Sequence, residues 1–118
     1  MATPRPFPSP ELPPTITALL EQAISRGPDR PFLGVRTSTS REASLTFREF
    51  GVAVEHAAAR LAAALEPREL VFIQGSPGPQ YAAAIFAAAR VNVILIPLDI
   101  RMTPDTIERI WERTAASA

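Results

Sequence analysis

Residues 70–98 read LVFIQGSPGPQYAAAIFAAARVNVILIPL and set the architecture of the chain. A short apolar run, Leu70–Gln74, is followed by a loop rich in Gly and Pro and then by an alanine-rich helix over Gln80–Arg90. A second apolar run, Val91–Leu98, has the nearly continuous hydrophobicity of a parallel strand that is buried on both faces. The whole stretch has the length of one right-handed β-α-β unit. The sequence therefore predicts the α/β fold class.

The segment before this unit predicts a helix and a hairpin. Thr15 can cap a helix that runs to about Arg26, because apolar residues recur between them at helical spacing. Pro31–Arg36 and Ser44–Thr46 have the composition of short strands, and the polar stretch between them is typical of a loop. We therefore expect a short hairpin in front of the next helix.

Thr46 begins the helix with the clearest start signal in the chain. Glu49 stands three residues later and completes a capping box, and Leu45 with Phe50 can form the hydrophobic staple. Pro67 forbids continuation of the helix. One face of this helix collects apolar side chains, namely those of Phe47, Phe50, Val54, Ala57, Leu61 and Leu65.

A last helix is predicted after Thr103, which can cap it, with Pro104 at its first position and Asp105 near the positive end of its dipole. Its apolar stripe has only one sheet on which to pack. Val91–Leu98 likewise has one certain strand partner, Leu70–Gln74. A bare sheet edge and an apolar face invite pairing with another chain, so we expect a homo-oligomer.

The length of 118 residues suits one domain. The composition, with 47% apolar and 20% charged residues, excludes an intrinsically disordered chain. Residues 1–14 hold six of the 13 prolines, which predicts a proline-rich flexible arm. A proline-motif ligand for a partner is the alternative. Residues 15–118 are the α/β domain.

Several function classes are excluded by composition. Twelve arginines balance twelve acidic residues, so a dedicated nucleic-acid binder is not expected. No apolar run could span a membrane, and the opening residues lack a signal core, so we expect a cytoplasmic protein. Cysteine and lysine are absent, which removes thiolate metal sites and lysine chemistry. His56, the single histidine, is interpreted as exposed and without a catalytic role.

A nucleotide site is a weak alternative at the β-α-β turn. Gly75 follows a strand, Gly78 precedes a helix, and Asp99 ends the next strand, as in a dinucleotide fingerprint. The third glycine is missing, however, and Pro77 and Pro79 remove two N–H donors that a pyrophosphate would need. A tight strand-to-helix turn explains the same residues.

Four motifs together resemble a known family. They are Leu45-Thr-Phe-Arg-Glu-Phe50, Pro79-Gln-Tyr81, the segment 88–99 ending in Ile-Pro-Leu-Asp, and Arg101-Met-Thr-Pro-Asp105. In this order and spacing they resemble the N-terminal part of the adenylate-forming (AMP-binding) superfamily, of acyl-CoA synthetase or fatty-acyl-AMP ligase type. Three sites depart from the family pattern. Asn92 stands where glycine is usual, and because asparagine tolerates a positive φ the turn there is expected to survive. Arg68-Glu69 replace the usual Gly-Asp, and Gln74-Gly75 interrupt what is commonly a longer apolar strand.

The resemblance implies an N-terminal fragment of the large domain of an ATP-dependent acyl-activating enzyme. That enzyme converts a carboxylate and ATP to an acyl adenylate and then to a thioester, with Mg and coenzyme A. Its phosphate-binding loop and catalytic lysine have no counterpart here, so the chain alone is expected to be inactive and to bind no cofactor alone. Asp99, Ile100 and Arg101 are the candidate cofactor-binding residues, at the edge of the coenzyme A channel.

Two other functions stay open at this point. The chain can be a free-standing interaction or relic module that self-associates, or a small nucleotide-binding α/β domain. The partner is accordingly either the remainder of the enzyme or a second copy of the chain.

Overall fold

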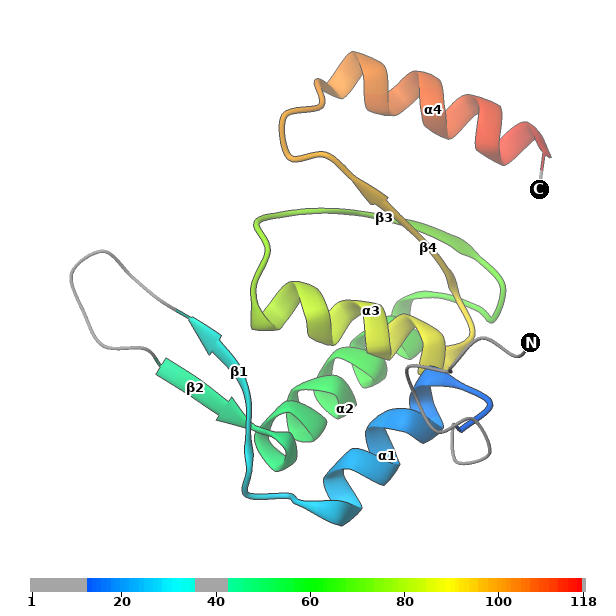
Figure 1. Cartoon of the computed structure of the whole chain (residues 1–118). Helices are drawn as coiled ribbons and strands as arrows, with labels where there is room; N and C mark the ends of the chain where they lie inside the picture. The colour runs from blue at the N-terminus through cyan, green and yellow to red at the C-terminus, as the bar shows by residue number, and fades with distance from the viewer. Residues whose placement is uncertain (1–12, 36–42, 118) are drawn as a thin grey trace, which may run out of the picture.

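The computed structural model describes residues 13–35 and 43–117, and Figure 1 shows their arrangement. In chain order the elements are α1 (Ile16–Arg26), β1 (Pro31–Val35), β2 (Ala43–Thr46), α2 (Phe47–Ala64), β3 (Leu70–Gln74), α3 (Pro79–Val91), β4 (Ile94–Leu98) and α4 (Pro104–Ser117). Nearly all of the predicted arm, residues 1–14, lies outside the described residues.

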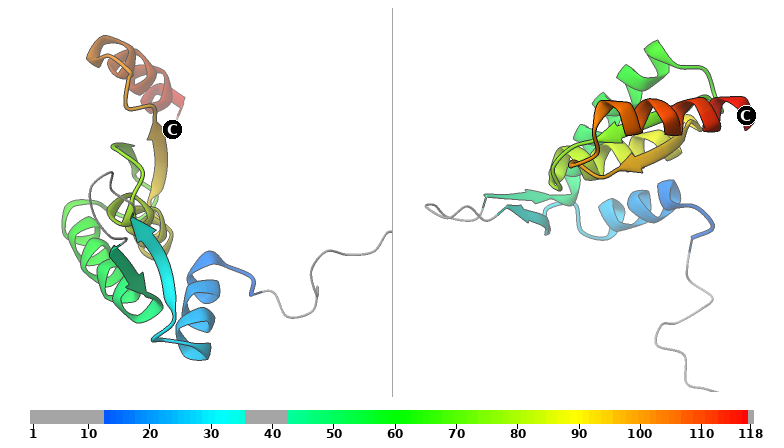
Figure 2. Two further views of the ribbon diagram at one scale, coloured as in Figure 1. Left: turned by 60° about the vertical axis from the view of Figure 1, so that its left-hand side comes forward. Right: turned by 90° about the horizontal axis from the view of Figure 1, so that it is seen from above.

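The strands form two separate pairs. β1 and β2 pair antiparallel as a hairpin, whereas β3 and β4 pair parallel with Leu70 opposite Ile94 and Gln74 opposite Leu98. Figures 1 and 2 show α3 on one face of the β3–β4 pair and α4 on the other. The α/β class, the hairpin and the β-α-β unit with flanking helices are thereby confirmed.

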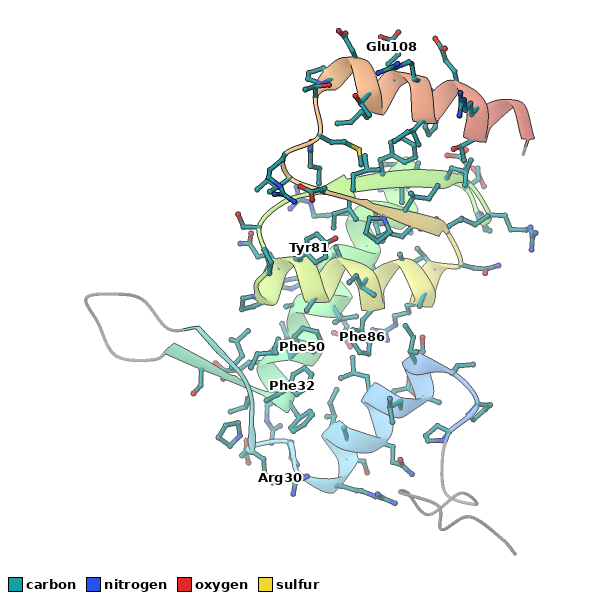
Figure 3. All side chains as sticks on the ribbon, turned by 45° about the horizontal axis from the view of Figure 1, so that its top comes forward. Arg30, Phe32, Phe50, Tyr81, Phe86 and Glu108 are labelled. Carbon is teal, nitrogen blue, oxygen red and sulfur yellow. The ribbon has the colours of Figure 1, made fainter. Side chains whose placement is uncertain are left out.

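The core lies where α2 crosses α1 and α3. Phe50 and Val54 on α2 are fully buried there, together with Ala83 and Ala87 of α3. The ring of Phe50 meets Phe86 edge-on at 5.5 Å and Phe32 of the hairpin at 5.0 Å (Figure 3). The hairpin is thus held to the helical layer by aromatic packing.

The predicted capping box forms as the sequence indicates. The Thr46 hydroxyl accepts the backbone N–H of Glu49 at 3.1 Å, and the Glu49 carboxylate accepts the N–H of Thr46 at 2.9 Å. Thr15 caps α1 in the same manner through the N–H of Ala18. Further along α2, a β-carbon on Gly51 would stand 2.7 Å from the Ile24 side chain, so this glycine lets α1 approach closely.

The strand predicted over Val91–Leu98 is too long at its start. Val91 ends α3, and Asn92 adopts the left-handed conformation (φ 61°), where its N–H reaches back to the last carbonyls of the helix. An asparagine in this conformation is a common helix stop, and the strand begins only at Ile94. Burial on both faces is also wrong for this strand, because Ile94 is 44% exposed and Pro97 is exposed.

The second departure from the family pattern lies beside the first. Arg68 also has a left-handed backbone (φ 71°), and its N–H donates to the carbonyl of Asn92 at 2.7 Å. The N–H of Ile94 then donates to the carbonyl of Glu69 at 2.8 Å. The left-handed backbone conformations of Arg68 and Asn92 therefore bring the first residues of β3 and β4 side by side.

Candidate functional site

The candidate residues Asp99, Ile100 and Arg101 follow β4 at the carboxyl end of the parallel strand pair. Ligands of α/β proteins bind at this end of a sheet. All three residues are exposed, and the side chain of Arg101 is 86% exposed. The position agrees with the predicted one, but nothing in the structure covers these residues.

Asp99 and Arg101 form a closed pair. The guanidinium donates from Nε to one carboxylate oxygen at 3.0 Å and from a terminal nitrogen to the other at 2.8 Å. The backbone N–H of Arg101 adds a third bond at 2.7 Å. The guanidinium first, and then this N–H, hold the pKa of the Asp99 carboxyl below its usual range, and the carboxylate in turn raises the pKa of Arg101.

Sequence reasoning missed the residue that fixes this loop, Gln74. Its side-chain N–H₂ donates to the carbonyl of Asp99 at 2.8 Å and to that of Met102 at 3.2 Å. It can do so because Gln74 ends β3 directly opposite Leu98, the last residue of β4. The sequence did carry a signal for this role, namely the amide side chain of Gln74 at the end of an otherwise apolar strand.

These contacts limit the chemistry of the loop. The Asp99–Arg101 pair has no net charge, and its hydrogen bonds account for both side chains as stabilising contacts of the turn after β4. Arg101 is 86% exposed, so part of its guanidinium stays open to solvent. Within residues 13–35 and 43–117, no three His, Cys, Asp or Glu side chains gather to hold a metal ion.

A groove of about 790 Å³ lies elsewhere, between α2 and the loop that leads into α3. His56 and Arg60, one helical turn apart on α2, face Tyr81 and the Ser76–Gly78 loop across it. Tyr81 is labelled at the start of α3 in Figure 3. Gly78 makes no side-chain cap, and the prolines at 77 and 79 lack N–H groups, so this turn offers few donors to a pyrophosphate.

None of the helices in the described part of the chain has the length and apolar character that a bilayer crossing requires. Twelve arginines and twelve acidic residues leave the whole chain without net charge.

Comparison with known proteins identifies the class to which this geometry belongs. A family model described as AMP-binding enzyme matches residues 20–118, so the chain belongs to the AMP-binding enzyme family. Among curated proteins, no significant match to the chain was found.

Solved structures share the fold. The chain is 18% identical to the Klebsiella oxytoca NpsA N-terminal subdomain (TM-score 0.73), and the match covers 86% of this chain and 26% of that one. IdnL1 matches at 15% identity and a TM-score of 0.75, covering 86% and 21%. The artificially fused NpsA-ThdA Adenylation-PCP di-domain of Klebsiella oxytoca matches at 18% and 0.72, covering 83% and 18%. The chain thus spans about a quarter or less of each of these chains.

Proposed function

We propose that the chain is the N-terminal portion of an ATP-dependent acyl-activating enzyme and that it supplies structure rather than catalytic groups. The family match over residues 20–118 carries this proposal. The parent enzyme joins a carboxylate to AMP with release of pyrophosphate and then transfers the acyl group to a thiol. ATP and Mg are held by the remainder of the enzyme, and the cytoplasm is where the protein works.

The acyl-CoA synthetase or fatty-acyl-AMP ligase type is the finer proposal. It rests on the four sequence motifs and on Arg101, whose exposed guanidinium suits one phosphate of coenzyme A at the edge of its channel. A second candidate is an adenylation unit that delivers its product to a carrier domain. The likeness to a fused Adenylation-PCP di-domain favours it at the level of the fold.

Carboxylate-dependent exchange of pyrophosphate into ATP tests the proposed function. The chain alone should give no exchange above a heat-treated control, because it has no lysine and no phosphate-binding loop. Co-expression with the product of the adjoining reading frame should restore exchange. Exchange by the chain alone would overturn the structural role, and an adjoining region without an adenylating segment would favour a free-standing module.

The acceptor thiol is tested on the restored enzyme. Coenzyme A and a carrier domain are offered separately as acceptors of the activated acyl group. Arg101→Gln should raise the KM for coenzyme A and leave pyrophosphate exchange unchanged, whereas Arg109→Gln on α4 is the matched control. Equal effects of the two variants would remove Arg101 from the coenzyme A site.

A further inference from the structure

The groove between α2 and the loop before α3 offers chemistry that the proposed function does not use. Its volume of about 790 Å³ falls in the range of small-molecule sites, which measure about 300–1,000 Å³. It shares no lining residue with the loop Asp99–Arg101. The groove is therefore a separate candidate binding site on the described part of the chain.

One part of the groove lining is apolar and is built from small or rigid residues. Ala53 and Ala57 on α2 have short side chains, which leave room for a ligand. Pro77 and Pro79 fix the backbone of the opposite wall, so little of this wall has to become ordered on binding. An apolar or aromatic ligand body can displace water here. The apolar lining residues are Leu45, Ala53, Ala57, Pro77, Pro79 and Ala83.

The ionisable side chains on the α2 wall of the groove are basic. Arg60 and His56 lie one helical turn apart on the face of α2 that borders the groove. No Asp or Glu stands among the described residues that line it. Glu55 is next to His56 in sequence but lines another hollow, where its carboxylate lies 4.0 Å from Arg90. An anion in the groove therefore meets a guanidinium without a competing carboxylate.

The polar side chains of the groove are free to bind a ligand. Within residues 13–35 and 43–117, none of them has a hydrogen-bond or ion-pair partner. The guanidinium of Arg48, by contrast, lies 3.2 Å from the Asp29 carboxylate. Arg60 thus keeps all of its N–H donors, a planar set that matches the oxygens of a carboxylate or a phosphate. The other free polar side chains are those of His56, Ser76, Gln80 and Tyr81.

Recognition in this groove falls to side chains rather than to the backbone. Pro77 and Pro79 have no N–H, and Gly78 precedes α3 without a side-chain cap. The turn thus lacks the run of backbone donors that cradles a pyrophosphate. A single oxyanion that is held by a guanidinium fits these donors better than a chain of phosphates does.

We propose that the groove binds a small organic anion, with an apolar or aromatic body on the alanine and proline side chains and one oxyanion group at Arg60 and His56. The hydroxyl groups of Ser76 and Tyr81 belong to the opposite wall and supply further donors. The oxyanion is a carboxylate or a phosphate monoester, since a guanidinium binds both. The inference is independent of the proposed function, because binding needs neither ATP nor the remainder of the enzyme.

Titration of the chain with phenyl phosphate, benzoate and benzamide, followed by NMR at constant pH, tests the proposal. His56, Tyr81 and Trp111 are the only histidine, tyrosine and tryptophan of the chain, so their ring signals need no further assignment. At least one of the two anions should shift the His56 and Tyr81 signals to saturation and leave Trp111 of α4 unchanged, and the tighter anion identifies the oxyanion. Benzamide, which has the shape of benzoate without its charge, should bind about tenfold more weakly than the tighter anion.

A pair of matched variants completes the test. Arg60→Gln removes the charge from the groove and should weaken anion binding about tenfold. Arg109→Gln on α4 removes an equal charge elsewhere and should leave the affinity unchanged. Equal affinities of the two variants, benzamide binding as tight as that of the tighter anion, or signals that do not saturate with either anion would each overturn the proposal. None of these outcomes bears on the proposed function, which pyrophosphate exchange tests.

Discussion

The helical layer and the strand pair with α4 differ in how far they bury their apolar side chains. In the helical layer of α1, α2 and α3, Phe50 is 0% and Val54 2% exposed, and both are surrounded by side chains from this chain alone. Among the side chains of β3, β4 and α4 whose burial is described, only Leu98 is buried, at 7% exposed, and Ile94 and Trp111 stay more than 40% exposed. The helical layer thus has a fully buried centre, although Leu19 and Val52 at its surface are 44% and 46% exposed, whereas the strand pair with α4 has no such centre among its described side chains.

This difference follows from how each element obtains its neighbours. Helices that are close in the chain can pack on one another with short connections, so the aromatic cluster around Phe50 closes locally. A parallel strand obtains each neighbour only through a crossover, and the described chain contains one β-α-β crossover. A sheet of only two described strands therefore leaves apolar surface exposed.

The largest expected effect separates the two regions directly. Phe50→Ala should lower the free energy of unfolding by about 3–5 kcal/mol, because it empties a fully buried site. Trp111→Ala should cost less than half as much, since the indole is half-exposed and contacts one ring. Chemical denaturation measures both, with Phe50→Leu as a milder variant in case Phe50→Ala does not fold. Equal losses would mean that the two regions form one core.

The start of α2 gives the next effect in size. Thr46→Ala removes the acceptor for the Glu49 N–H and should lower the free energy of unfolding by about 1 kcal/mol. Glu55→Ala on the same helix is the control, because its exposed carboxylate stands 4.0 Å from Arg90 and such pairs contribute little. The prediction fails if denaturation midpoints of the two variants coincide.

A substitution at the junction between the two regions, Arg68→Gly, is expected to raise the thermal stability of the chain. Arg68→Gly removes the left-handed penalty of a residue with a β-carbon, about 1–2 kcal/mol, against a glycine entropy cost of about 0.5–1 kcal/mol. Thermal unfolding should therefore shift upward in Arg68→Gly and not in Arg68→Ala, which keeps the β-carbon. An equal shift in both would trace the effect to the lost charge instead of the backbone.

The smallest effect concerns the exposed loop after β4. The folded-state pKa of Asp99 is lowered by Arg101, so the stabilisation from this pair is present above the unfolded pKa and is lost as pH falls through the folded value. Arg101→Gln should raise the Asp99 pKa toward its ordinary value, as followed by NMR of the carboxyl carbon. Because the pair is exposed, the melting temperature near neutral pH should scarcely change. An unaltered Asp99 titration would show that the pair does not persist in solution.

Local signals determined much of this protein from the sequence alone. Thr46 with Glu49, and Thr15, specify helix starts by contacts within one turn, and the order of apolar runs specifies the β-α-β unit. The four motifs, the last two of which end at Asp99 and Asp105, indicated the AMP-binding family, which the match over residues 20–118 confirmed. Such features depend on neighbours in the chain, so no tertiary information was required to find them.

Tertiary structure decided what depends on the backbone path and on residues distant in the chain. The paired left-handed conformation of Arg68 became evident only once β3 and β4 stood side by side. The bonds from Gln74 to the loop after β4 span 25 or more residues.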